Sequence, residues 1–290
     1  MTYGVHVRPP GTMDVRTRLW AVQVALPSTA CFTSLTSAAV RDWWLPPLPP
    51  GLPLFVAAGP HGCVTRPGLD VCRHGVVPSW ERLDGVRVAT GAETLLALAR
   101  DLGLLDVVVL GDGALHLGHT TRSELEHVAA QRRRGAPLLR RAIPLMNGRS
   151  ESIYEGLLRV LHVVCGVAGE PQYEVLDQSS FVVARADLHL TGTQRLAEYD
   201  GEHHLERLQQ RQDLRRSGRL EDAGYERRGY TKEDVLYGPS VILRDADRAL
   251  GRTHDPHRIG AWHDLLRESL FTGAGQQRLL SRLGIEKKPL

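Results

Sequence analysis

Three carboxylates lie close together in a stretch whose pattern predicts a β-hairpin. Two short apolar runs flank a turn at residues 191–193, with Asp187 in the first run and Glu198 and Asp200 near the end of the second. Because Glu198 and Asp200 are two residues apart, both side chains point to one face of a sheet. Carboxylates among apolar residues are costly unless they bind a cation or another partner. The hairpin therefore predicts a site that holds a divalent metal.

A plainer interpretation of the same residues stays open. In that case Glu198 simply ends a strand, and Asp200 with Gly201 forms an ordinary turn. The choice depends on whether other parts of the chain supply matching residues.

The composition is that of an ordinary globular protein. The chain has 290 residues, enough for two modest domains, and 42% of them are hydrophobic. No apolar run approaches the ~20 residues of a membrane span, and the first residues lack the charged-then-apolar pattern of a signal sequence. The four cysteines are scattered without a Cys-x-x-Cys pair, which indicates buried free thiols. We therefore expect a cytoplasmic protein with no membrane partner.

The net charge of the chain gives little information, but the types of its basic residues give more. A net charge of +3 is too small to indicate nucleic acid by itself. Basic residues are nearly all arginine, an imbalance typical of a GC-rich genome, and the lysines are Lys232, Lys287 and Lys288. This scarcity limits which residue could act as a catalytic lysine.

The pattern predicts a mixed α/β region at 1–148, a second α/β domain at 149–250 and a helical tail at 251–290. In the first region we expect helices at 14–26, 34–44, 93–102 and 121–134, strands at 54–58 and 86–89, and a segment of ambiguous type at 104–115. Thr121 and Glu124 predict a capping box for the last of these helices. Its closing arginines, 132–134, suit the negative end of the helix dipole, and a DNA contact is the alternative.

The second domain has the element order of a layered α/β fold. Ser152 and Glu155 are spaced as another capping box, before a helix that runs to about Cys165. We then expect a strand at 173–176, the hairpin, a polar helix at 205–223, a strand at 225–230, a helix after Thr231 and a tail helix at 262–271. This order predicts helices packed on a sheet.

Arginines recur every fourth residue along the polar helix and form a basic stripe: Arg207, Arg211, Arg215 and Arg219. A solvated helix face is the ordinary interpretation of such a stripe, and phosphate contact with salt-dependent DNA binding is the functional one. Arg216 lies three residues after Asp213. The two form either a simple ion pair on the helix or a pair that orients phosphate and metal.

Several of these features together resemble the bacterial domain family related to very-short-patch-repair endonucleases, within the PD-(D/E)XK nuclease superfamily. The matching motifs, in family order over about ninety residues, are Ser152-x-x-Glu155-x-x-x-Arg159, Asp187-Leu188, Ala197-Glu198-Tyr199-Asp200-Gly201-x-His203, Asp213-x-x-Arg216-x-x-x-Leu220-x-x-x-Gly224-Tyr225 and Thr231-x-x-Asp234-Val235. The region 1–148 more loosely resembles the AbiEi-type antitoxin region of actinobacterial proteins, through residues 34–39 and 92–99.

The resemblance implies a restriction-endonuclease-like mixed sheet flanked by helices, and hydrolysis of DNA phosphodiester bonds with Mg²⁺ or Mn²⁺. Such ions neutralise the phosphoryl oxygens and activate water, and Mg²⁺ needs only two or three carboxylates because it keeps several waters. By the resemblance, Asp187 is the central ligand and Glu198 the second. Glu155 reaches in from the preceding helix.

One position departs from the superfamily pattern. The residue two after the second acid is usually a lysine that orients the attacking water, and here it is Asp200. His203 is the best substitute for proton transfer, since an unperturbed imidazole titrates near pH ~6.5. Asp200 could then be an extra metal ligand.

Two other functions stay open. The chain could be a non-catalytic DNA-binding or antitoxin-like regulator that retains the nuclease fold, with a toxin or defence-system partner. It could also be a protein-interaction module without nucleic acid.

Overall fold

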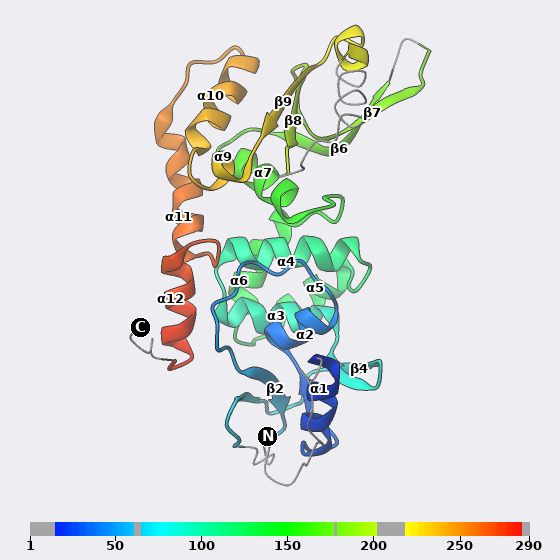
Figure 1. Cartoon of the computed structure of the whole chain (residues 1–290), viewed down its shortest axis with the longest axis vertical. Helices are drawn as coiled ribbons and strands as arrows, with labels where there is room; N and C mark the ends of the chain where they lie inside the picture. Colours follow the sequence, from blue (N-terminus) through cyan, green and yellow to red (C-terminus); the bar gives the residue numbers. More distant parts are fainter. Residues whose placement is uncertain (1–14, 61–64, 177–178, 202–217, 286–290) are drawn as a thin grey trace. The chain divides into compact units, whose positions relative to one another are not determined.

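The structure is a computed structural model that describes residues 15–60, 65–176, 179–201 and 218–285 (Figure 1). The fold is mixed α/β, as predicted, with two mixed sheets flanked by helices. The chain divides into two compact units. The first unit is Met1–Met146 together with Glu268–Leu290, and the second unit is Asn147–Arg267.

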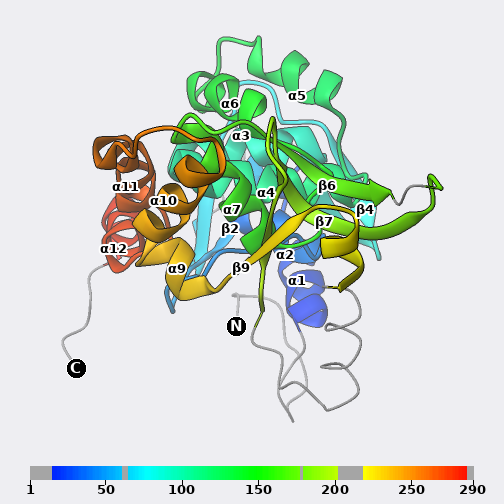
Figure 2. The same cartoon turned by 90° about the horizontal axis from the view of Figure 1, so that it is seen from above.

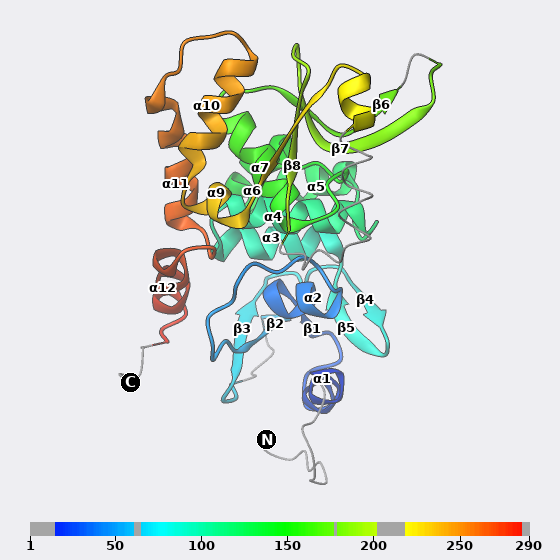
Figure 3. The ribbon, with the colours of Figure 1, turned by 45° about the horizontal axis from the view of Figure 1, so that its top comes forward.

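The first unit contains a five-stranded sheet in the order β3-β2-β1-β5-β4, visible across Figure 3. Its strands are β1 (Cys31–Phe32), β2 (Leu54–Ala58), β3 (Leu69–Arg73), β4 (Trp80–Leu83) and β5 (Val86–Ala89). The sheet is mixed because β1–β5 and β2–β3 are parallel whereas β1–β2 and β4–β5 are antiparallel. The predicted strands β2 and β5 are confirmed, and the sequence analysis missed the other three.

The helices of the first unit are α1 (Val15–Val24), α2 (Ser34–Val40), α3 (Gly91–Asp101), α4 (Leu104–His116), α5 (Arg122–Ala129), α6 (Ala136–Ala142), the short 3-10 helix η1 (Ile143–Leu145) and α12 (Gly273–Arg282). The ambiguous segment is helix α4, which is buried all round over residues 104–114, as expected of a helix that is apolar on every side. Burial on all faces removes the periodicity that would have identified it.

Two predicted helices end earlier than expected. The helix expected at 34–44 ends at Val40, because the backbone turns to a positive φ of 54° at Asp42. The helix expected at 121–134 begins with the predicted capping box of Thr121 and Glu124 but ends at Ala129. The arginine run therefore lies in a turn before Gly135, which has a φ of 89°, and not in the last turn of the helix.

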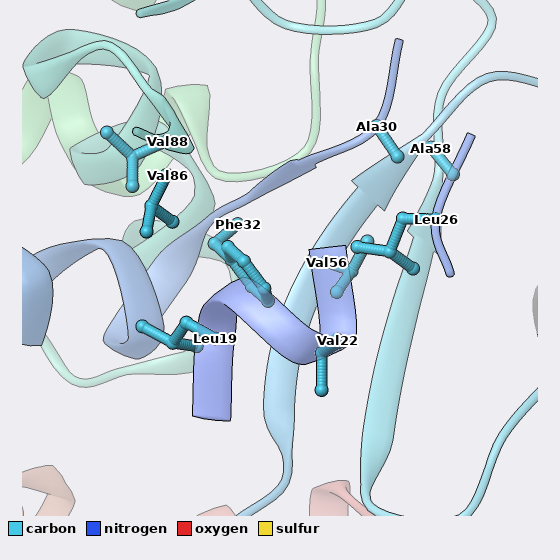
Figure 4. Close-up of a cluster of buried hydrophobic side chains, with 9 residues drawn as sticks. All are labelled: Leu19, Val22, Leu26, Ala30, Phe32, Val56, Ala58, Val86 and Val88. Carbon is cyan, nitrogen blue, oxygen red and sulfur yellow. The ribbon is translucent and has the colours of Figure 1, made fainter. Parts of the chain in front are cut away.

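A cluster of apolar side chains joins α1 to the first sheet (Figure 4). Leu19 of α1, Phe32 of β1 and Val56 of β2 are fully buried in it. Burying side chains of this size contributes about 1.5–3 kcal/mol each. The opposite side of α1 leaves Trp20 58% exposed, so only one side of this helix is used for packing.

The second unit contains a four-stranded sheet in the order β6-β7-β8-β9. Its elements are α7 (Ile153–Val164), β6 (Gly169–Leu176), β7 (Val182–Leu190), β8 (Arg195–Tyr199), β9 (Glu226–Tyr230), α9 (Lys232–Leu236), α10 (Pro239–Ala249), the 3-10 helix η2 (Pro256–Ile259) and α11 (Gly260–Glu268). Strands β6, β7 and β8 are successively antiparallel, and β9 is parallel to β8. Helices α9 and α10 lie on one side of β9 in two views (Figures 1 and 2).

Most elements expected for this unit are confirmed, including the hairpin with its 191–193 turn. Thr193 fixes that turn, because its hydroxyl donates to the oxygen of Leu190 at 2.8 Å and accepts from the backbone N–H of Arg195 at 2.9 Å. Helix α10 was missed. The expected helical tail at 251–290 is divided, since α11 belongs largely to the second unit and α12 to the first. Among the helices of the described residues, none is long and apolar enough to cross a membrane.

The described cysteines are free thiols, and Cys31 and Cys165 are buried as predicted. Burial raises the pKa of the Cys31 thiol to about 12. Cys72 is only half-buried, so the prediction is wrong for this residue. It lies at the end of β3, next to a cavity in the first unit.

Candidate functional site

The hairpin places two of the predicted acids beside each other. Strands β7 and β8 pair Leu188 with Ala197 and His189 with Leu196, so the same register brings Asp187 alongside Glu198. Where the ladder ends, Oδ2 of Asp187 accepts a hydrogen bond from the backbone N–H of Tyr199 at 2.8 Å. This carboxylate therefore helps to hold β8 in place.

Glu198 and Asp200 share one guanidinium group. Arg227 on β9 donates through Nε to Glu198 and through Nη2 to Asp200, the latter at 2.6 Å. The side chain of Glu198 is only 4% exposed, whereas that of Asp200 is 46% exposed. Burial acts to lower the pKa of Arg227, but the hydrogen bonds and charges of Glu198 and Asp200 outweigh it and raise that pKa. The single charge of Arg227 thus offsets one of the two negative charges of these acids.

Gly229 makes room for this arrangement. It pairs with Glu198 in the parallel β8–β9 ladder. A Cβ atom at position 229 would collide with the carboxylate of Asp200. Only glycine therefore lets Asp200 lie over β9 within reach of Arg227.

Glu155 is held at the start of α7. Its carboxylate accepts from the backbone N–H of Glu151 and from Nε2 of Gln172, both at 2.8 Å. Ser152 accepts from the N–H of Glu155 at 3.3 Å, so half of the predicted capping box is present. The other half is shifted by one residue, because the Glu155 carboxylate bonds to Glu151 instead of Ser152.

Glu198 and Asp200 lie on the face of the sheet opposite Tyr199. The ring of Tyr199 stacks on Tyr154 of α7 with centroids 4.7 Å apart. Since neighbouring residues of a strand point to opposite faces, Glu198 and Asp200 point away from α7. Lys232 hydrogen-bonds Tyr154, which places it on the side of Tyr199 and not with the acids.

The acids of the predicted magnesium site have other partners in this structure. Arg227 binds one oxygen each of Glu198 and Asp200, and Gln172 binds Glu155. Across the described ranges, no group of three or more His, Cys, Asp or Glu side chains is placed to hold a metal ion. A divalent ion on the oxygens that Arg227 occupies would have to displace it, because two cations at the same oxygens repel each other.

Several predicted residues lie outside the described part of the chain, between 202 and 217: His203, Arg207, Arg211, Arg215 and Arg216. The last arginine of the predicted stripe is described. Arg219 is exposed, and the next residue, Leu220, is buried against Val175 and Leu196. An outward direction for this end of the stripe agrees with both interpretations of it.

Three arginines that the sequence analysis did not select form a second cluster beside β9. They are Arg228, Arg244 and Arg248, around a cavity of about 320 Å³ between β9 and α10. Arg244 and Arg248 are exposed and have no ion pair among the described residues, and Arg228 is 3.7 Å from Asp245. Their spacing on α10 is the signal that could have found them, but that helix was not predicted.

The acids of this cavity are occupied by neighbours. Asp245 pairs with the buried Arg195 at 3.0 Å and accepts from the hydroxyl of Tyr230 at 2.8 Å. Asp234 accepts from the N–H of Thr231 at 2.9 Å in the capping box of α9. These acids therefore offset only part of the positive charge of the cavity.

Comparisons with protein families, with curated proteins and with solved structures gave no match to this chain.

Proposed function

We propose that the second unit binds the phosphate backbone of DNA and that Arg227 takes the place of a catalytic metal beside Glu198 and Asp200. The element order supports this proposal, because α7, three antiparallel strands and the parallel strand β9 follow one another as the nuclease-like resemblance implies. The three described cysteines are free, which accords with the cytoplasm as its location.

The Arg228, Arg244 and Arg248 cluster is the basis for DNA binding. Guanidinium groups form bidentate, charge-assisted bonds to phosphate, and such contacts position a protein on DNA without reading its sequence. Arg244 and Arg248 are one turn apart on the exposed side of α10, so both can reach successive phosphates of a strand.

The guanidinium of Arg227 is the observation that favours binding over hydrolysis. Hydrolysis of a phosphodiester requires charge neutralisation at the phosphoryl oxygens and an activated water, which carboxylate-bound metals supply. Here the carboxylates of Glu198 and Asp200 bind the guanidinium of Arg227 instead of a metal. The unit is therefore a DNA-binding regulator with a nuclease-like sheet.

Metal-dependent hydrolysis is the second candidate, favoured by the register that sets Asp187 beside Glu198. In this case Arg227 leaves the acids when DNA and metal bind. The two candidates differ in whether purified protein nicks supercoiled plasmid with Mg²⁺ or Mn²⁺. Nicking that is abolished by Asp187→Ala and by Glu198→Ala would establish the second candidate and exclude the first.

The binding itself is tested by fluorescence anisotropy with a labelled duplex. We expect an affinity that falls by roughly 40-fold between about 50 and 200 mM salt, as three phosphate contacts predict. Arg244→Ala with Arg248→Ala should remove most of the affinity and reduce the salt dependence. Arg267→Ala is the matched control, because Arg267 is 71% exposed and lies outside the cluster. Equal affinity of the double variant and the control would refute the proposal.

A further inference from the structure

A cavity within the first unit has no role in the proposed function. Its volume is about 790 Å³, within the ~300–1,000 Å³ of small-molecule sites. Residues 72–79 after β3 form one wall, α3 forms another, and the turn with Arg133 and Arg134 completes it. These segments are far apart in sequence, so the cavity is a product of the fold.

The wall is strongly basic. Four arginines line it, Arg73, Arg100, Arg133 and Arg134, and Glu93 is the single carboxylate among the lining residues. A cavity with this balance attracts anions and concentrates them, because its low-dielectric walls focus the field.

Two of the arginines are held in place by acids. Both terminal nitrogens of Arg133 donate to Glu93, at 2.7 and 2.6 Å. Arg100 donates from Nε and Nη2 to Asp101, at 2.9 and 2.6 Å, and from Nη1 to the sulfur of Cys72. The wall is therefore pre-organised, which reduces the entropy lost when a ligand binds.

The other two arginines are available for a ligand. Arg73 and Arg134 are exposed, and neither has an ion pair within the part of the chain that the structure describes. The pKa of His74 reflects the excess of positive charge at the same wall. Burial and the charges of Arg133 and Arg100 lower its pKa, although Glu93 acts in the opposite direction.

Part of the remaining surface of the cavity is apolar. Val76 is 85% exposed there, and the half-buried Val77 and Ala97 also line the cavity. An exposed valine between arginines gains nothing from a bare inorganic ion, but it gains from contact with an organic group.

We propose that this cavity binds a small organic phosphate of the size of a mononucleotide, with the phosphate at Arg73 and Arg134 and the organic part over Val76, Val77 and Ala97. The planar guanidinium fork matches phosphate oxygens in pairs, and the apolar wall covers the rest of the ligand. This site is in the first unit, so its existence does not depend on DNA binding by the second.

Calorimetry with the full chain tests the proposal, with AMP, ADP and ATP as probes beside inorganic phosphate and pyrophosphate. We expect saturable binding of at least one nucleotide that is stronger than binding of phosphate or pyrophosphate. Arg73→Ala and Arg134→Ala should each weaken it by about tenfold or more, the loss expected for one charge-assisted bond. Arg132→Ala is the matched control, because it removes the same charge two residues before Arg134, at a position that does not line the cavity.

Cys72 provides a second measurement in the same cavity. Its half-buried thiol should be alkylated by iodoacetamide in the native protein, whereas the buried Cys31 should not. Site-resolved mass spectrometry should show that a bound nucleotide slows alkylation of Cys72 in the wild type and in Arg132→Ala. The protection should be lost at the same nucleotide concentration in Arg134→Ala.

Each outcome of these measurements either supports or overturns nucleotide binding in the cavity. Nucleotide binding that depends on Arg73 and Arg134 and protects Cys72 supports the proposal. It is overturned by the absence of saturable nucleotide binding, by equal binding in Arg134→Ala and Arg132→Ala, or by phosphate and pyrophosphate binding as tightly as nucleotides. DNA affinity that falls in these variants without any mononucleotide binding also overturns it, and would assign the wall to nucleic acid.

Discussion

Asp106 of the first unit and Asp247 of the second unit are both almost completely buried, and their hydrogen-bond partners differ in charge. Asp106 on α4 of the first unit accepts only from neutral groups, the hydroxyl of Ser269 at 2.5 Å and the backbone N–H of Leu270 at 3.1 Å. Asp247 on α10 of the second unit accepts from Arg252 at 2.6 Å, from His254 at 2.8 Å and from Arg258. The same residue type therefore has neutral donors in one unit and cationic donors in the other.

The partners determine which charge state each unit prefers. Burial raises the pKa of Asp106 from 3.8 to about 7, because its neutral donors only partly offset the lost hydration. Burial also acts to raise the pKa of Asp247, but the bonds from Arg252, His254 and Arg258 outweigh it and lower that pKa below 3.8. A buried carboxylate thus makes the first unit sensitive to rising pH and the second unit sensitive to falling pH.

The largest expected effect is the response of the first unit to pH. The folded pKa of Asp106 is raised, so its contribution to stability is complete below pH 3.8 and is lost as the pH rises to about 7. A shift of this size corresponds to a loss on the order of 4 kcal/mol in the unfolding free energy. Hydrogen exchange with mass spectrometry, resolved by unit, should show faster exchange in the first unit at pH 8 than at pH 5 after correction for intrinsic rates.

Asp106→Asn tests whether Asp106 causes the pH dependence of the first unit. An asparagine stays neutral at every pH, so the pH dependence of the first unit should flatten between pH 4 and 7. An unchanged pH dependence in this variant would show that Asp106 is not its source.

Removal of Asp247 should have the next largest effect, and in the second unit only. Asp247→Ala removes the carboxylate that Arg252 and Arg258 bind. These two side chains are 36% and 24% exposed, so we expect a cost of about 1.5–3 kcal/mol, the range for hydrogen bonds to a charged group. Denaturant unfolding followed by hydrogen exchange measures this loss. Asp264→Ala is the control, since its ion pair with Arg267 is exposed and contributes at most about 1 kcal/mol.

His162 adds to the acid sensitivity of the second unit and so increases its difference from the first unit. Burial lowers the pKa of this histidine from 6.5 to about 4, although a bond to the oxygen of Leu158 acts the other way. The stability that depends on the neutral ring is present above pH 6.5 and is lost as the pH falls to about 4, by roughly 3 kcal/mol. His162→Phe should flatten the acid limb of the unfolding curve of the second unit. The prediction fails if this limb is as steep as in the wild type.

The smallest effect concerns the ion pairs at the open edge of the second sheet. Gly229→Ala should displace Asp200 from Arg227 and cost about 0.5–1 kcal/mol, because the new methyl group occupies the place of the carboxylate and breaks a partly exposed ion pair. Thermal unfolding measures the cost. In the Asp200→Ala background the same substitution should cost almost nothing, since no carboxylate then competes with the new methyl group. An equal cost in both backgrounds would indicate that the backbone of β9 is strained instead.

Local patterns in the sequence predicted much of this fold. The capping box of Thr121 and Glu124 and the hairpin turn at 191–193 depend on residues close in the chain, so their spacing was sufficient. Strand β1 was missed because two residues carry no periodic pattern, and β3 and β4 were missed because Asp70, Glu81 and Arg82 interrupt their apolar runs. Helix α10 was not predicted, although Pro239 at its start suits the first turn of a helix.

In the candidate site, local sequence patterns identify the acids but not their partners. The sequence identified Asp187, Glu198 and Asp200, since carboxylates in an apolar hairpin need a partner. It could not identify that partner, because Arg227 is 29 residues from Glu198 and meets it only through the parallel β8–β9 pairing. Asp106 and Ser269 are a similar case, with 163 residues between them.

The sequence by itself determined most of the elements, the order of those elements and the chemical groups that need partners. Only the tertiary structure decided which partners these groups have, and therefore their charge. Asp106 and Asp247 are the same residue in the sequence, yet one has a raised pKa and the other a lowered one. The physical reason is that the energy of a buried charge depends on the donors within a few ångströms, and folding brings those donors from distant parts of the chain.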